Sequence, residues 1–128
     1  MKFIYIAGKY TGDTHDYHSF FQIARHILAA TETAAKLARL GYGFFNPHQH
    51  SAHFEVITPE VKPDYWYALD FHFLQHCDAL LLLPGWKESR GARMERDLAE
   101  SLGIPHFHSV EELLEKMPPD GDEFEGEG

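Results

Sequence analysis

Four short apolar runs alternate along this chain with longer segments that have helical spacing. The runs have the length and composition of buried strands, and they occupy residues 3–7, 42–45, 79–83 and 104–107. The segments with helical spacing occupy residues 16–40, 65–76 and 92–102, and a last one follows Ser109. Strands that alternate with helices favour a mainly parallel sheet covered by helices on both faces. We therefore predict an α/β protein, a single-domain Rossmann-like or flavodoxin-like three-layer sandwich with four or five strands.

Two helices carry recognisable start signals. Asp64 has the side chain of an N-cap for the helix expected over residues 65–76. Ser109 and Glu112 form a Ser-x-x-Glu capping box, in which each side chain accepts a hydrogen bond from a free backbone amide. These signals predict where the second and the last helix begin.

Composition limits the class of protein and its partners. The length suits one domain, residues 1–117, followed by an acidic, glycine-rich tail over 118–128 that we expect to be disordered. The net charge of −9 argues against nucleic acid as a partner, because binding its backbone needs clustered Lys and Arg. No apolar run approaches the roughly 20 residues that cross a bilayer, and the N-terminus lacks the layout of a signal peptide. We therefore expect a cytoplasmic protein without membrane contact. The single cysteine, Cys77, excludes an internal disulfide.

The connection after the second strand is the least regular part of the sequence. It holds His48, His50 and His53 within six residues, but Pro47 and polar neighbours give no frame that would converge three metal ligands. A ligand-facing loop, a plain surface loop and a metal site all stay open as interpretations, although we expect neither a metal nor a cofactor. Residues 54–58 could supply the fifth strand.

One carboxylate interrupts an otherwise apolar stripe. Glu95 shares its face of the helix over 92–102 with alanines and leucines, and it lies one turn inside this helix, which begins just past the carboxyl end of a strand. In open parallel sheets this edge is where ligands bind. A second carboxylate, Asp70, has aromatic neighbours one turn away on both sides. It is either a solvated surface residue or a second group of the same site.

Two glycine-containing loops follow strands and have the features of phosphate sites. The helix that carries Glu95 is directly preceded by Ser89, Arg90 and Gly91. Backbone amides at a helix start form a natural phosphate cup. The loop that begins with Gly8 and Lys9 could also hold a phosphate through its amides and the ammonium, or could be a plain strand-to-helix turn.

These groups together suggest a reaction. A carboxylate on a packed face is poorly hydrated, which raises its pKa, whereas the helix start and Arg90 or Arg93 would favour ionisation. An anionic, poorly hydrated Glu95 is a nucleophile, and with Asp70 it has the apparatus for cleaving a glycosidic bond. A phosphate cup beside such a pair suggests a nucleotide substrate.

Three motifs in this order make the chain resemble a known family. They are Ile4-Tyr-Ile-Ala-Gly8, Asp70 eight residues before Asp78, and Ser89-x-Gly91-x-x-x-Glu95. Over residues 3–107 the chain is similar to the nucleoside 2-deoxyribosyltransferase-like superfamily. That superfamily includes the 2′-deoxynucleoside 5′-phosphate N-hydrolases and related small bacterial and phage proteins.

The resemblance implies roles for individual residues. Glu95 would form a covalent deoxyribosyl intermediate, Tyr5 would be an active-site tyrosine, and Asp70 would orient the sugar or the base. Gly8 and the following loop would line the nucleotide pocket of a homo-oligomer. In the transferase branch an acid typically stands six residues before the nucleophile. Here that residue is Ser89, as in the monophosphate hydrolases, where Ser and Gly hold the 5′-phosphate.

The sequence thus favours an N-glycosidase that hydrolyses a (deoxy)nucleoside 5′-monophosphate through a covalent glycosyl-Glu95 intermediate. Two other functions stay open: a nucleoside 2-deoxyribosyltransferase that exchanges bases on free deoxynucleosides, and a nucleotide-binding or sensing module without chemistry. Glu95 could also be a structural residue that forms an ion pair with Arg93 or another basic group.

Overall fold

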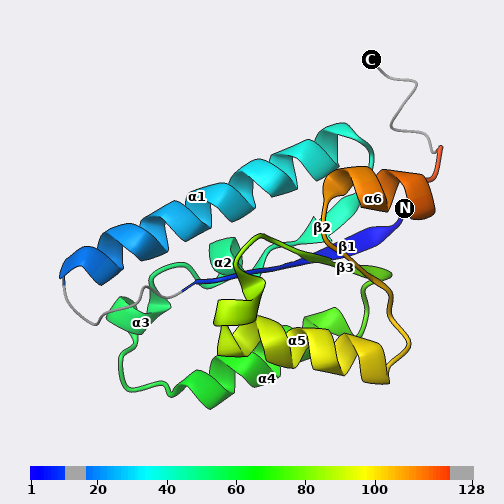
Figure 1. The fold of residues 1–128 in the computed structure, drawn as a ribbon. Helices are drawn as coiled ribbons and strands as arrows, with labels where there is room; N and C mark the ends of the chain where they lie inside the picture. Colours follow the sequence, from blue (N-terminus) through cyan, green and yellow to red (C-terminus); the bar gives the residue numbers. More distant parts are fainter. Residues whose placement is uncertain (11–16, 122–128) are drawn as a thin grey trace.

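The computed structural model describes residues 1–10 and 17–121. Within them the chain forms four strands, six α-helices and one turn of 3-10 helix (Figure 1). The strands are β1 (Phe3–Ala7), β2 (Gly43–Phe45), β3 (Ala79–Leu82) and β4 (His106–Phe107). The helices are α1 (Tyr17–Arg39), α2 (Pro47–His50), α3 (Phe54–Ile57), α4 (Pro63–Leu74), η1 (Trp86–Glu88), α5 (Arg90–Ser101) and α6 (Val110–Lys116). No helix in this part of the chain combines the length and the hydrophobicity needed to cross a bilayer.

The four strands form one parallel sheet in the order β2-β1-β3-β4. Tyr5 in the central strand β1 lies opposite Phe45 of β2 and Leu80 of β3. Helices α1 and α6 cover one face of the sheet, and α4 and α5 cover the other (Figure 1). The predicted three-layer α/β sandwich is therefore confirmed, with four strands.

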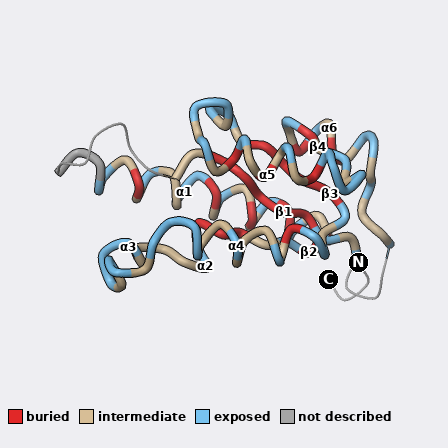
Figure 2. Tube along the Cα trace, turned by 90° about the horizontal axis from the view of Figure 1, so that it is seen from below, coloured by how far each residue is buried: buried red, intermediate tan, exposed pale blue. Residues whose placement is uncertain are grey.

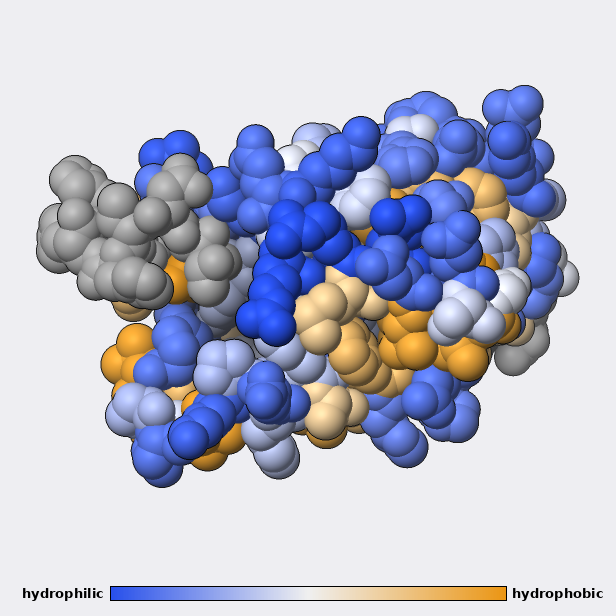
Figure 3. Space-filling view, turned by 60° about the horizontal axis from the view of Figure 1, so that its bottom comes forward, coloured by the Kyte–Doolittle hydropathy of each residue, from blue (hydrophilic) through white to orange (hydrophobic). Residues whose placement is uncertain are grey.

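Alternate residues of β1 supply two separate cores. Ile4 and Ile6 pack with Leu37 of α1 and Leu113 of α6 on one side of the sheet. Tyr5 belongs to the cluster on the other side, beneath α4 and α5. Buried residues are concentrated in the strands, because helices cover both faces of the sheet (Figure 2). The outer surface on the side of α4 and α5 is largely hydrophilic, with hydrophobic side chains in separate groups (Figure 3).

The segment between β2 and α4 is helical, and the fifth strand suggested at residues 54–58 is wrong. The amides of Val56 and Ile57 both donate to the carbonyl of His53, and the amide of Thr58 donates to the carbonyl of Phe54. These backbone groups are satisfied within one turn, so they take no part in strand pairing. Val56 and Ile57 have the composition of a strand, but both are exposed, and local hydrogen bonds decide their conformation.

Helix α4 begins before its expected start. Lys62 is its N-cap residue, Pro63 stands at the first helical position, and Asp64 lies inside the first turn. The predicted capping role of Asp64 is therefore wrong. The fixed φ of proline is suited to the first position of a helix, and an acidic residue in the first turn interacts favourably with the helix dipole.

The described residues after α6 lie against the N-terminus. The Lys2 ammonium donates to the carbonyl of Pro118 at 2.8 Å, and Asp120 forms an ion pair with the amino group of Met1 at 3.1 Å. Residues 122–128, which carry most of the expected acidic tail, lie outside the described part of the chain. The disorder of that tail stays a prediction.

Replacing Ser109 by Ala should lower the free energy of unfolding by about 1 kcal/mol, the usual cost of losing an N-cap. The Ser109 hydroxyl oxygen accepts from the amide of Glu112 at 3.0 Å. The Glu112 carboxylate accepts from the amide of His108 at 2.9 Å, one residue before the position expected for a capping box. Urea unfolding followed by circular dichroism measures the loss.

Ser101→Ala is the matched control. Ser101 is exposed in the last turn of α5, and its hydroxyl donates to the carbonyl of Leu98. Its replacement should change the unfolding free energy by less than about 0.5 kcal/mol. Equal losses in the two variants would contradict a specific capping role for Ser109.

Candidate active site

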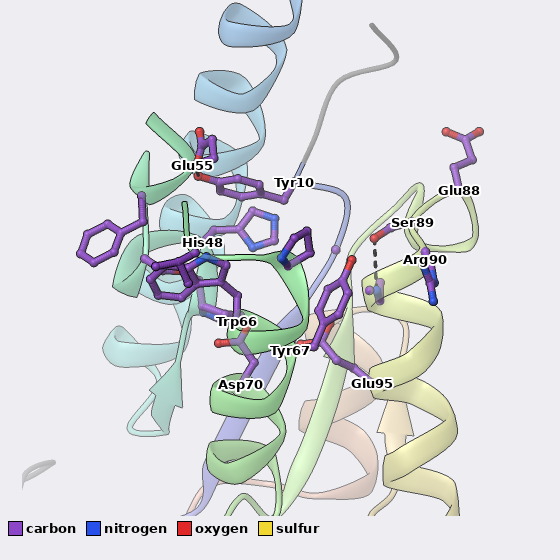
Figure 4. A pocket seen from close by; sticks show the side chains of 18 of the residues that line it. Tyr10, His48, Glu55, Trp66, Tyr67, Asp70, Glu88, Ser89, Arg90 and Glu95 are labelled. Carbon is purple, nitrogen blue, oxygen red and sulfur yellow. Dashed lines mark hydrogen bonds between the residues drawn. The ribbon is translucent and has the colours of Figure 1, made fainter. Parts of the chain in front are cut away.

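A cavity of about 590 Å³ opens at the carboxyl edge of the sheet, between α4 and α5. Its volume is in the range of small-molecule sites. The chain leaves β1 toward β2 on one side and returns to β3 on the other, so the strand order reverses at this point. Such reversals are where open parallel sheets bind ligands. Figure 4 shows the cavity between residues of α4 and the segment before it on one side and the start of α5 on the other.

The Glu95 carboxylate is held in position by Tyr5. The Tyr5 hydroxyl donates a hydrogen bond to Oε2 of Glu95, and both residues are buried. Burial raises the pKa of Glu95 to about 8, and the hydrogen bond from Tyr5 opposes this rise because it stabilises the carboxylate. Burial, followed by the charge of Glu95, raises the pKa of Tyr5 well above its ordinary value. The tyrosine therefore stays a hydrogen-bond donor at neutral pH.

Asp70 is the second carboxylate of the cavity and comes from α4. Its Oδ1 atom is buried and has no hydrogen-bond partner among the described residues. Burial raises the pKa of Asp70 to about 7, and its negative charge adds to the rise at Glu95. Ionisation of one group therefore opposes ionisation of the other, and the two titrate as a pair near neutral pH.

The start of α5 forms the wall beside the carboxylates. The Ser89 hydroxyl oxygen accepts from the amide of Ala92 at 3.1 Å (Figure 4), so its hydrogen remains available to another acceptor. The first amides of a helix, here those of Arg90 and Gly91, have no partner within it. Gly91 also lets α4 approach, since a Cβ there would lie 3.1 Å from Cε1 of Tyr67. This wall is suited to an anion.

Lys9 lies at the rim of the cavity. Its ammonium forms an ion pair with Glu88 at 3.2 Å, and the Glu88 side chain is 70% exposed. Glu88 lines the cavity next to Ser89. The ion pair therefore places a negative charge at the same rim as the helix start.

The wall opposite α5 is aromatic and is organised by hydrogen bonds around Tyr10. The Tyr10 hydroxyl accepts from the amide of His53 at 2.9 Å and donates to Oε2 of Glu55 at 2.9 Å. The ring of Tyr10 meets the ring of His48 edge-on, with 5.2 Å between centroids. Trp66 lines the same side of the cavity (Figure 4).

Comparison with protein families identifies the family to which this chain belongs. Residues 2–108 match the model of a domain of unknown function, DUF4406, over most of the chain. The chain belongs to the DUF4406 family. Comparison with curated proteins gave no significant match.

The fold of this DUF4406 protein is shared with a solved enzyme. A 2-deoxyribosyltransferase from the bacterium Bacillus psychrosaccharolyticus superposes with a TM-score of 0.50 and 18% sequence identity. The match covers 81% of this chain and 69% of that one. At this identity the likeness concerns the fold, and it confirms the nucleoside 2-deoxyribosyltransferase-like fold indicated by the sequence motifs.

Most of the residues that the sequence indicated meet at this cavity of the DUF4406 protein. Its lining includes Gly8, Asp70, Ser89, Arg90, Gly91 and Glu95. Tyr5 lies beneath the cavity floor and reaches the cavity through Glu95. Lys9 does not line the cavity and is held at the rim by Glu88.

The arginines expected to favour ionisation of Glu95 do not pair with it. The Arg93 guanidinium donates to the carbonyl of Lys87 at 2.6 Å, and no ion pair joins Glu95 to Arg90 or Arg93. Residues two apart on a helix face different directions. The structural ion pair between Glu95 and Arg93 is therefore wrong, and the donor to Glu95 is Tyr5.

The side chains of the three histidines after β2 contact different partners. Nε2 of His48 donates to the carbonyl of Lys9 at 2.8 Å, His50 packs against Phe45, and His53 stacks on Phe20. Among residues 1–10 and 17–121, no three His, Cys, Asp or Glu side chains are grouped to hold a metal ion. Of the three histidines, His48 alone lines the cavity, and the ligand-facing interpretation of this segment stays a prediction.

Trp66 and Tyr67 were not expected from the sequence as residues of the site, although aromatic neighbours of Asp70 were evident. Trp66 and Tyr67 stand four and three residues before Asp70, and this spacing places all three near one face of a helix. Tyr10 lies in the loop after Gly8, which the resemblance placed in the nucleotide pocket, and it lines the cavity. Glu55 had no signal in the sequence, since its position depends on the unexpected helix α3.

We expect the contribution of the two carboxyl groups to stability to be lost as pH rises from about 4 to about 8. Burial raises the pKa of Asp70 from 3.8 to about 7 and that of Glu95 from 4.5 to about 8. Between these limits the folded state binds more protons than the unfolded state, so the free energy of unfolding falls with rising pH. Urea unfolding at a series of pH values measures this slope.

Glu95→Gln should flatten the slope, because glutamine does not titrate. Glu100→Gln is the matched control, since Glu100 is exposed near the other end of α5, and it should keep the slope of the unmodified protein. An unchanged slope in Glu95→Gln would contradict the raised pKa of Glu95.

Proposed function

We propose that this DUF4406 protein is an N-glycosidase that hydrolyses the N-glycosidic bond of a (deoxy)nucleoside 5′-monophosphate. One observation carries the proposal: Glu95, with its buried donor Tyr5, faces the same cavity as Asp70, beside a helix start that suits an anion. The shared fold with a 2-deoxyribosyltransferase supports nucleoside chemistry in general.

Glu95 is the nucleophile of this proposal. Its Oε2 atom accepts the hydrogen bond from Tyr5, which leaves Oε1 to form the bond to C1′ of the sugar. Poor hydration makes the carboxylate reactive, and the Tyr5 hydrogen bond favours its charged form. Tyr5 acts through Glu95, so it is a positioning residue.

Asp70 transfers the proton. With a pKa of about 7 it holds a proton in much of the population near neutral pH. In the free protein the higher pKa of Glu95, about 8, keeps the proton of the pair mainly on Glu95. The mechanism requires bound substrate to shift this proton to Asp70. The Tyr5 hydrogen bond favours that shift because it stabilises the charge on Glu95, whereas Oδ1 of Asp70 has no donor.

The reaction then proceeds in two displacements. In the first, the C1′–Oε1 bond to Glu95 forms while the C1′–N bond breaks, and the base leaves with the bonding electron pair and the Asp70 proton. In the second, water attacks C1′, gives a proton to Asp70 and displaces Glu95. The products are the free base and the sugar 5-phosphate.

The start of α5 receives the 5′-phosphate in this proposal. The hydroxyl of Ser89 and the amides of Arg90 and Gly91 are donors, and the Arg90 guanidinium adds a positive charge at the cavity lining. Lys9 at the rim is a further cation, although Glu88 competes for it.

Base transfer between free deoxynucleosides is the second candidate, because the solved protein of the same fold is a 2-deoxyribosyltransferase. The two reactions share the first displacement and differ in whether water or a second base attacks C1′. We favour hydrolysis because Ser89, six residues before Glu95, offers a hydroxyl to a phosphate and no acid to a base.

Incubation with ribo- and deoxyribonucleoside 5′-monophosphates and the matching nucleosides should release free base from the monophosphates alone. Glu95→Gln should lower this release by about 10³-fold or more and keep monophosphate binding, because glutamine cannot form the covalent intermediate. Chromatography measures the base, and Glu100→Gln is the control with unchanged activity.

Other results would identify the other candidates. Reaction of free deoxynucleosides alone, with a second base required, would favour the transferase. Nucleotide binding without product from any substrate would favour a sensing module.

Glu88→Gln should lower the KM for monophosphates by about two- to fivefold, the scale of one exposed charge interaction. The change removes a negative charge from the rim and releases Lys9 from its ion pair with Glu88. The Kd of free nucleosides, measured by calorimetry, should not change. Glu115→Gln, exposed on α6, is the control, and a higher KM for monophosphates in Glu88→Gln would contradict the proposed phosphate position.

A further inference from the structure

The wall opposite α5 carries polar groups that the proposed mechanism does not use. In that mechanism the phosphate occupies the start of α5 and the sugar lies at Asp70 and Glu95. The base is then left with the opposite side of the cavity, which His48, Tyr10 and Trp66 line with aromatic rings (Figure 4). Flat rings suit a flat base, since aromatic side chains stack on the π-face of any base.

Glu55 is held at this wall as a hydrogen-bond acceptor. Its Oε2 atom accepts from the hydroxyl of Tyr10 at 2.9 Å, and that hydroxyl in turn accepts from the amide of His53 at 2.9 Å. The only hydrogen of the Tyr10 hydroxyl is therefore used, and Tyr10 has none to donate to a base. The carboxylate of Glu55, which lines the cavity, offers lone pairs.

His48, like Glu55, has a lone pair that can accept a hydrogen bond. A carbonyl can only accept, so the bond of 2.8 Å to the carbonyl of Lys9 requires the hydrogen to be on Nε2 of His48. Burial lowers the pKa of His48, so the ring is neutral and its Nδ1 carries a lone pair. The imidazole, the phenol and the carboxylate of this wall thus have lone pairs to offer and no spare hydrogen.

We propose that Glu55 selects a base with an exocyclic amino group. This inference rests on the proposed function, because it concerns the base that the same reaction releases. The amino group of a cytosine- or adenine-type base donates to the carboxylate. Replacing that group by a carbonyl, as in uracil or hypoxanthine, turns a lone pair toward the carboxylate and leaves both acceptors without a hydrogen.

The test compares matched nucleotides on a chain that cannot turn them over. Calorimetry on Glu95→Gln would measure the Kd of deoxycytidine and deoxyuridine 5′-monophosphates, and of deoxyadenosine and deoxyinosine 5′-monophosphates. Each amino member should bind at least about fivefold more tightly than its oxo partner, because a hydrogen bond to a charged group is replaced by a repulsion. Base release by the unmodified protein should follow the same order.

Glu55→Gln, added to Glu95→Gln, should reduce each ratio to less than about twofold, because the glutamine amide can also donate to a carbonyl. Glu60→Gln in the same background is the control and should keep the ratios, since Glu60 is exposed and does not line the cavity. Unfolding curves establish that each variant is folded.

Equal affinities within the pairs, or ratios that survive Glu55→Gln, would overturn this inference. Release of base from monophosphates by the unmodified protein would leave the proposed function standing in that case. Absence of both binding and base release for every nucleotide would overturn the proposed function, and the inference with it.

Discussion

The hydrogen bond from Tyr5 to Glu95 joins the central strand of the sheet to the cavity. Tyr5 belongs to the central strand β1, which is paired on both sides, and its side chain is fully buried. The position of the Glu95 carboxylate is therefore set by the sheet as well as by its own helix. Groups held on packed strands and helices are positioned more precisely than groups on loops.

Burying Glu95 and Asp70 costs stability, and the fold offsets only part of that cost. Glu95 has one buried donor in Tyr5, whereas Oδ1 of Asp70 has no partner among the described residues. The two carboxyl groups consequently remain protonated over an unusual pH range. Such perturbed pairs are concentrated at functional sites.

The parts of this structure that could be predicted are those determined by local sequence. Buried strands are apolar runs, and Glu95 was visible because it interrupts a helical stripe. The parts that escaped prediction depend on residues far apart. The ion pair of Lys9 joins it to a residue 79 positions away, and Glu55 reaches the cavity only because one helical turn forms where β-branched residues favoured a strand. No local pattern contains that information.

The close contact between Gly91 and Tyr67 has a consequence for the shape of the site. A Cβ at Gly91 would lie 3.1 Å from the Tyr67 ring, so this glycine sets how near α5 can come to α4. One of these helices carries Glu95 and the other carries Asp70. The absence of a side chain at Gly91 thus sets the distance between the Glu95 and Asp70 carboxyl groups, neither of which Gly91 touches. Related chains could retune the width of the site by changing this glycine while keeping the same carboxylates.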